Sequence, residues 1–179
     1  TATWRIVSGP AATGGTLSAV AGATTQLTVA KPSAANSATG GVWIVGVTLS
    51  DGVAVSAETQ TSVLAYPSFA SDVYPILLTS CATTGCHTVP AMAGSLDLST
   101  APAAWTNLVG QGSIGSTTYP LRVNPNDHAN SWMWVRVNAG SMPKNGTKLP
   151  QWQIDIIRDW IEPEGKGAAG TMSTGAENN

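Results

Sequence analysis

The hydrophobic pattern of this 179-residue chain changes near residue 65, and this change constrains the fold more than any other feature. Before it, β-rich runs alternate with turn residues, and Asp51-Gly52 between two such runs is a strong hairpin signal. After it, apolar residues recur at helical spacing in residues 68–80 and 149–161. We therefore predict a multidomain chain, with a small all-β domain in residues 1–65 and an all-α domain in residues 66–165. Residues 166–179 have no core-forming pattern and are predicted to be a flexible C-terminal tail.

The charge and the hydropathy of the sequence argue against a nucleic-acid partner and against a membrane-spanning segment. Only 10% of the residues are charged, and the formal net charge is −2. Because binding to phosphates needs a basic face, we expect no nucleic-acid partner. The chain also has no run of eighteen apolar residues, so we expect no transmembrane segment.

The stretch CATTGCH contains both cysteines of the chain and one of its two histidines, at Cys81, Cys86 and His87. In the short motif for c-type haem attachment, two cysteines are followed directly by a histidine. Each thiol adds to a vinyl group at the porphyrin edge, and the next residue turns its imidazole toward the iron. Here four residues separate the cysteines where two are usual, so the intervening loop has to bulge outward. The order of the groups nevertheless predicts one covalently bound haem c.

A disulfide and a zinc site are the alternatives to haem for the same stretch. Two cysteines five positions apart can close a disulfide in a secreted protein. A structural zinc site would use both cysteines together with His87 and His128, although zinc ligands usually come as two short pairs.

The second part of the chain resembles the class I monohaem cytochrome c family. The resemblance covers residues 67–165 and depends on four elements in order: FASDVYPILLTS, CATTGCH, SMPKNGTKLP and QWQIDIIRDWIEPEG. It implies that Cys81 and Cys86 form the haem thioethers, that His87 is the proximal iron ligand and that Met142 is the distal one. The four-residue spacer departs from the pattern of that family.

The first part resembles an immunoglobulin-like repeat family that includes the polycystic kidney disease domains. TWRIVSGP is similar to its central tryptophan strand, and GVWIVGVTLSDGVAVSAETQTSVLA to its closing strands. In that family, one or two strands precede the tryptophan strand, whereas Trp4 here is almost at the start of the sequence. We therefore expect an incomplete sandwich with an open edge.

Several further residues are candidates for supporting roles at the haem. His128 competes with Met142 for the sixth position on the iron, whereas Met133, between two tryptophans, is expected to pack in the core. A backbone carbonyl in Thr88-Val89-Pro90 is predicted to accept a hydrogen bond from the proximal imidazole. Arg122 and Arg136 are candidates to pair with the haem propionates, or else are solvated surface residues.

The predicted function is one-electron transfer outside the cytoplasmic membrane, in the periplasm or at the cell surface. A haem with both axial positions filled has no place for a substrate, so we expect a carrier with redox protein partners and not an enzyme. The alternatives are a haem-bearing subunit of an enzyme complex and a structural or adhesive surface protein. A further hypothesis is that the open edge of the β domain accepts a strand from another copy, giving a homo-oligomer or filament for extracellular electron transfer.

Overall fold

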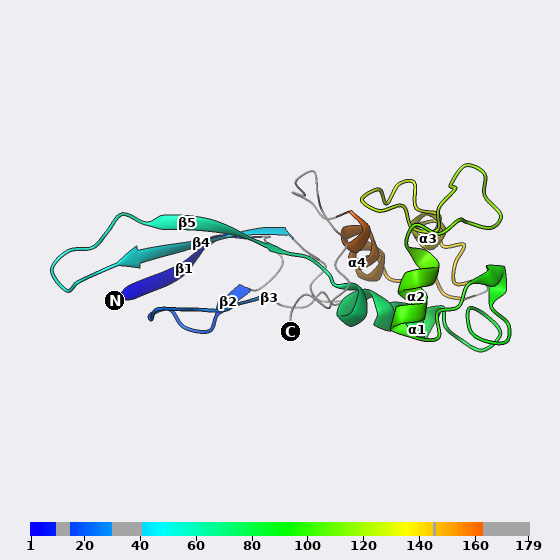
Figure 1. Cartoon of the computed structure of the whole chain (residues 1–179), viewed down its shortest axis with the longest axis horizontal. Helices are drawn as coiled ribbons and strands as arrows, with labels where there is room; N and C mark the ends of the chain where they lie inside the picture. Colours follow the sequence, from blue (N-terminus) through cyan, green and yellow to red (C-terminus); the bar gives the residue numbers. More distant parts are fainter. Residues whose placement is uncertain (10–14, 30–40, 145, 163–179) are drawn as a thin grey trace. The chain divides into compact units, whose positions relative to one another are not determined.

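The computed structural model describes residues 1–9, 15–29, 41–144 and 146–162, which fall into two compact units (Figure 1). Unit 1 is Thr1–Tyr66 and unit 2 is Pro67–Asn179. The predicted tail, residues 166–179, lies outside the described residues, as do residues 163–165 at the end of the predicted second domain.

Unit 1 contains five strands in two sheets. β1 (Ala2–Ser8), β4 (Gly41–Leu49) and β5 (Thr59–Ala65) form an antiparallel sheet in the order β1-β4-β5. β2 (Gly15–Leu17) and β3 (Leu27–Val29) form an antiparallel pair. The strands on either side of Asp51 and Gly52 pair as a hairpin, as predicted, and the Asp51 carboxylate accepts the backbone N–H groups of Val53 and Ala54 at 2.8 and 2.9 Å.

Buried and exposed side chains alternate along the first part of β4, and this alternation shows which face of the larger sheet is buried. Trp43 and Val45 are 3% and 6% exposed, whereas the preceding residue Val42 is 39% exposed. Because successive strand side chains point to opposite faces, one face of β4 supplies the core of unit 1. Residues of both sheets line a cavity of about 440 Å³, among them Trp4, Leu17, Leu27 and Val63.

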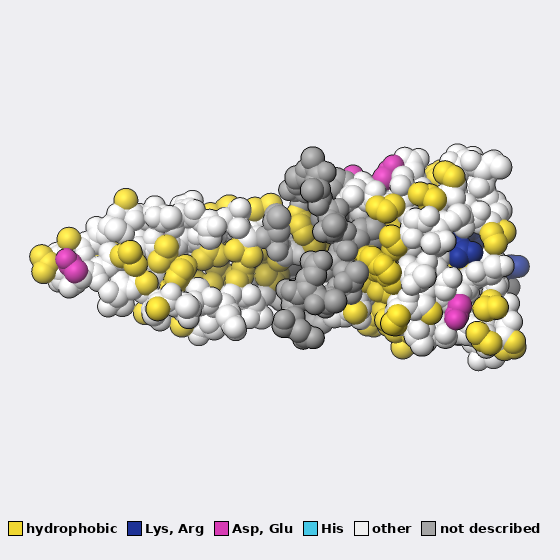
Figure 2. Space-filling view, viewed as in Figure 1, with side chains coloured by type: hydrophobic (Ala, Val, Ile, Leu, Met, Phe, Trp, Pro, Cys, Tyr) yellow, Lys and Arg dark blue, Asp and Glu magenta, His cyan; other side chains and the backbone are white. Residues whose placement is uncertain are grey.

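The viewed surface carries few charged side chains, and a band of hydrophobic side chains runs along unit 1 (Figure 2). This agrees with a chain in which only 10% of residues are charged. Within the described ranges, no helix has both the length and the apolar character needed to cross a lipid bilayer.

Unit 2 contains the described helices. A π-helix, η1 (Phe69–Val73), leads directly into α1 (Tyr74–Ser80), and a short 3₁₀ turn, η2 (Ala93–Ser95), follows the cysteine-rich stretch. α2 (Ala101–Leu108), α3 (Trp132–Asn138) and α4 (Gln151–Ile161) complete the unit. The expected apolar face of residues 149–161 forms in α4, where Ile157, Trp160 and Ile161 are fully buried.

Three aromatic rings hold η1, α2 and α4 together in the core of unit 2. The centroid of Phe69 lies 5.3 Å from that of Trp105 and 5.0 Å from that of Trp160, and the two tryptophans are 5.8 Å apart. Such tilted and edge-on pairs are the preferred geometries for aromatic contacts. The cluster therefore connects helices that are distant in sequence.

The predicted fold class, an all-β immunoglobulin-like sandwich followed by an all-α cytochrome c domain, is wrong. The described residues form a mixed α/β structure of four α-helices and five strands in two small sheets, with 28% helix and 25% strand, and unit 2 is not clearly all-α. Its residues 109–131 are joined by isolated β-bridges, Val109 to Val123 and Leu121 to both Gly112 and Ser131. This region is rich in Gly, Pro and Ser, which disfavour helix and leave the backbone to pair as extended loops.

α2 is a helix that the spacing of apolar residues in the sequence does not predict. α2 begins after Thr100, whose hydroxyl accepts the backbone N–H of Ala103, and it carries a proline in its first turn. A threonine cap followed by an early proline is a recognised helix start, so the signal was present in the sequence.

Candidate functional site

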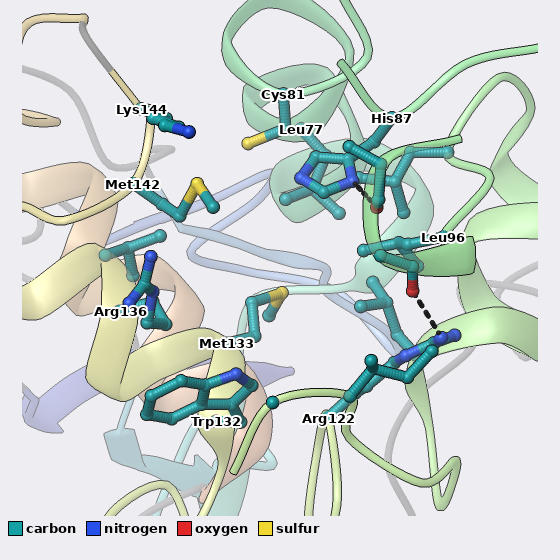
Figure 3. A pocket seen from close by; sticks show the side chains of 17 residues that line it. Leu77, Cys81, His87, Leu96, Arg122, Trp132, Met133, Arg136, Met142 and Lys144 are labelled. Atoms are coloured by element: carbon teal, nitrogen blue, oxygen red, sulfur yellow. Dashed lines mark hydrogen bonds between the residues drawn. The ribbon is translucent and has the colours of Figure 1, made fainter. Parts of the chain in front are cut away.

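Unit 2 encloses a cavity of about 490 Å³ between the cysteine-rich stretch, α3 and the loop before α4 (Figure 3). Its walls carry a thiol, an imidazole, two thioethers, three cationic groups and several apolar side chains. The lining residues with functional groups are Cys81, His87, Met133, Met142, Arg122, Arg136, Lys144 and Trp132. The volume lies within the range of about 300–1,000 Å³ that is typical of pockets for small molecules and cofactors.

The four-residue spacer folds into a closed loop that brings His87 back to Cys81. The backbone N–H of Cys86 donates to the Thr83 carbonyl at 2.9 Å, and the N–H of His87 donates to the Cys81 carbonyl at 3.2 Å. Gly85 has a φ of +82°, a left-handed conformation that glycine adopts without the cost of a Cβ clash. A turn therefore accommodates the two extra residues of the spacer, and Cys81 and His87 both line the cavity.

A hydrogen bond from one ring nitrogen to the backbone fixes the side chain of His87. Its Nδ1–H donates to the carbonyl oxygen of Ala93 at 2.8 Å, so the predicted acceptor within Thr88-Val89-Pro90 is not the one used. The opposite edge of the ring faces the cavity (Figure 3). Burial lowers the pKa of the imidazole and the charge of Arg122 lowers it further, against the opposing effect of the Ala93 hydrogen bond. The neutral imidazole with a free Nε2 is the form that binds metal ions.

The two cysteines differ in their positions. Cys81 lines the cavity and packs against the hydrophobic core, and burial, followed by the charge of Cys86, raises the pKa of its thiol to about 11. Cys86 is half-buried on the same loop but is not among the residues that line the cavity. Both thiols are free, so the disulfide hypothesis is not supported.

Met142 and Met133 bring thioethers to the same cavity from different segments. Met142 follows α3, where its backbone N–H donates to the Arg136 carbonyl at 3.2 Å, and its sulfur is turned into the cavity (Figure 3). Met133 lies on α3 and also lines the cavity, whereas the sequence predicts only a packing role for it. A signal was available, since Met133 and Arg136 are three residues apart and share a helix face.

His128 is not among the residues that line this cavity. Its Nδ1 lies 2.6 Å from a carboxylate oxygen of Glu162, and its ring packs edge-on against Trp134 with centroids 4.5 Å apart. The zinc hypothesis needs His128 beside the cysteines. In the part of the chain that the structure describes, no three His, Cys, Asp or Glu side chains are grouped to hold a metal ion.

The charged side chains around the cavity all have the same sign. Arg122, Arg136 and Lys144 line it, and no Asp or Glu is among the described lining residues. Since the whole chain is net negative, three cations at one cavity favour a ligand that bears carboxylates. The cavity therefore combines an apolar interior, nitrogen and sulfur donors, and cations for an acidic group.

These residues fit a haem in composition. Imidazole and thioether are usual axial ligands of haem iron, and a metal-binding histidine normally donates its other N–H to a backbone carbonyl or carboxylate, as His87 does. The position of Cys86 outside the lining departs from a two-thioether site, as the four-residue spacer does. No family model, no curated protein and no solved structure matches this chain.

Proposed function

We propose that this protein is a monohaem c-type electron carrier. The observation that supports this most strongly is the arrangement of His87, with Nδ1 bonded to the Ala93 carbonyl and its other edge facing a cavity that also contains Cys81 and Met142. A histidine anchored in this way beside a thiol and a thioether offers the types of donor group that a c-type haem requires. The resemblance of residues 67–165 to class I cytochromes c supports the same function.

Each residue has a defined role in this proposal. Cys81 and Cys86 hold the porphyrin edge through thioethers, while His87 and Met142 provide the axial ligands. Arg136 and Lys144 balance the charge of the propionates. The bound haem supplies a one-electron couple between ferrous and ferric iron. The apolar walls, among them Leu77, keep water away and so help to set the potential.

The protein acts as a carrier and not as an enzyme, because both axial positions on the iron are filled by its own side chains. Haem is attached to c-type cytochromes outside the cytoplasmic membrane, so we place the protein in the periplasm or at the cell surface. Its partners are redox proteins. A subunit of an enzyme complex with an open sixth position is the alternative, and binding of carbon monoxide to the isolated protein would favour it.

The experiment that tests the proposal is the intact mass of the denatured protein, expressed with a c-type maturation system. One covalent haem is the expected addition. A mass equal to that of the bare chain would contradict the proposal. Alkylation of the denatured haem-bound protein tests the second thioether, because a Cys86 thiol that has not added to a vinyl group takes up the reagent and a bonded one does not.

Assembly through unit 1 is a second part of the proposal. Within the described residues, β5 pairs with β4 alone, so it is an edge strand of the β1-β4-β5 sheet. An exposed edge is a template for a strand from another copy. A head-to-tail contact of this kind need not close and so gives filaments. Light scattering and electron microscopy of purified protein test this, and purely monomeric protein would contradict it.

A further inference from the structure

Arg122 makes three hydrogen bonds to backbone carbonyls beside the cavity. Its Nη1 donates to Asn107 at 2.8 Å, and its Nη2 donates to Gly94 at 3.0 Å and to Ser95 at 3.1 Å. Asn107 lies near the end of α2, so the guanidinium bridges this helix and the turn at residues 93–95. An arginine occupied in this way differs from both sequence-based expectations, a propionate partner or a solvated surface residue.

The turn that Arg122 contacts has an unfavourable backbone conformation. Met92, Gly94 and Ser95 have φ values of +36°, +68° and +53°. Left-handed conformations are costly for Met92 and Ser95, which carry a Cβ, and they persist only where surrounding contacts enforce them. Ala93, whose carbonyl accepts the hydrogen bond from His87, lies in the middle of this turn.

We infer that Arg122 is a positioning residue for His87, because it holds the strained turn that carries the Ala93 carbonyl and so orients the imidazole toward the cavity. The chain of contacts is continuous: guanidinium to the Gly94 and Ser95 carbonyls, Ala93 carbonyl to Nδ1–H, and the ring to the cavity. The inference rests on the proposed function for what His87 binds. Whether Arg122 stabilises the turn at residues 92–95 does not depend on the proposed function.

Substitution of Arg122 by lysine distinguishes this positioning role from a purely electrostatic one. An Arg122→Lys variant keeps the positive charge but lacks the planar fork that reaches several carbonyls together. If Arg122 acts through position, lysine fails to replace it. If Arg122 acts through charge, lysine restores the native behaviour.

Hydrogen exchange of the full-length protein provides the first measurement. The N–H of Ala93 donates to the Cys86 carbonyl and that of Leu98 to the His87 carbonyl, both at 2.8 Å, so these two amides report the order of the turn. In Arg122→Lys and Arg122→Met we expect them to exchange about tenfold faster, with the α4 amides unchanged. Lys148→Met, which removes an exposed cation that does not line the cavity, is the matched control and should leave all of them unchanged.

The reduction potential provides the second measurement, because a merely structural role would not change it. A weaker hydrogen bond at Nδ1 makes the imidazole a poorer donor to iron, so the potential of Arg122→Lys should rise above that of the native protein. Native exchange rates or a native potential in Arg122→Lys would overturn the inference. If Arg122→Met does not fold, Arg122→Lys still decides the question. A missing haem in the intact mass would instead refute the proposed function, and exchange at Ala93 and Leu98 would then still test the order of the turn.

Discussion

The imidazole Nδ1 of His87 lies 2.8 Å from the backbone carbonyl oxygen of Ala93, six residues further along the chain. Because this bond uses one ring nitrogen, the other is the nitrogen available at the cavity. A backbone acceptor cannot be removed by a side-chain substitution, so the orientation of the ring depends on the conformation of the turn. A change in the conformation of the turn at residues 92–95 should therefore also change the orientation of the His87 ring.

Met142→Ala is expected to remove the distal ligand of the proposed haem. In the native ferric protein, sulfur-to-iron charge transfer should give a weak absorption band near the red end of the spectrum, and the variant should lose it. Thioether ligation raises the potential relative to two imidazoles, so a substitute nitrogen ligand should lower the potential. Absorption spectroscopy and redox titration measure these changes.

Met133→Leu and His128→Ala are the controls for that experiment. Met133 lines the same cavity, and His128 is bonded to Glu162 away from it, so both variants should keep the band. If Met133→Leu loses the band and Met142→Ala keeps it, the distal ligand is Met133.

The Cys81 thiol of the haem-free protein is expected to resist alkylation near neutral pH. Burial raises its pKa from 9.0 to about 11, so the thiolate fraction there is about a hundredfold lower in the folded state. A Cys86→Ser variant lets mass spectrometry follow Cys81 alone, with the denatured chain as reference. Equal rates in the folded and denatured protein would contradict the raised pKa.

The raised pKa of the Cys81 thiol also predicts that the stability of the folded protein depends on pH. A raised folded-state pKa means that the folded protein binds the proton more tightly than the unfolded chain. This contribution, about 2–3 kcal/mol, is fully present below pH 9 and is lost as the pH rises toward about 11. Urea unfolding of haem-free Cys86→Ser should show this loss, and Cys81→Ala in the same background should not.

Leu77 and Leu78 are neighbours on α1 that differ in burial, at 1% and 47% exposed. Leu77→Ala should lower the free energy of unfolding by about 2–5 kcal/mol, because it leaves a cavity in the core of unit 2. Leu78→Ala should change it by less than about 0.5 kcal/mol. Denaturant unfolding followed by tryptophan fluorescence measures both, and similar losses would contradict the described packing.

Gly85 tests how the spacer between the cysteines is folded. Gly85→Ala should destabilise the protein by about 1–2 kcal/mol, since a Cβ is costly at its φ of +82°. Gly112→Ala is the matched control, because Gly112 does not have a left-handed φ and a Cβ added there would meet open space. The two variants should differ in thermal unfolding, and equal midpoints would show that the loop does not need the left-handed residue.

The amino-acid sequence was sufficient for features that depend on neighbours along the chain. The Asp51-Gly52 hairpin follows from local turn chemistry, and the apolar face of α4 follows from the spacing of Ile157, Trp160 and Ile161. The order Cys81, Cys86, His87 predicts haem attachment from one short stretch, and this stays a prediction. The start of α2 also has a local signal, in Thr100 and the proline two residues after it.

Only the tertiary structure decided the contacts between distant segments. The mixed character of unit 2 comes from bridges such as Leu121 to Ser131, and pairing between extended loops leaves no periodic signal in the sequence. Met133 and Met142 line one cavity together with Cys81 and His87, which belong to a distant part of the sequence. Arg122 contacts the Gly94 and Ser95 carbonyls, 28 and 27 residues away in the sequence, only because the tertiary structure brings these segments together. Local propensities act within a few residues, whereas a site made of side chains from several segments exists only after the core has packed.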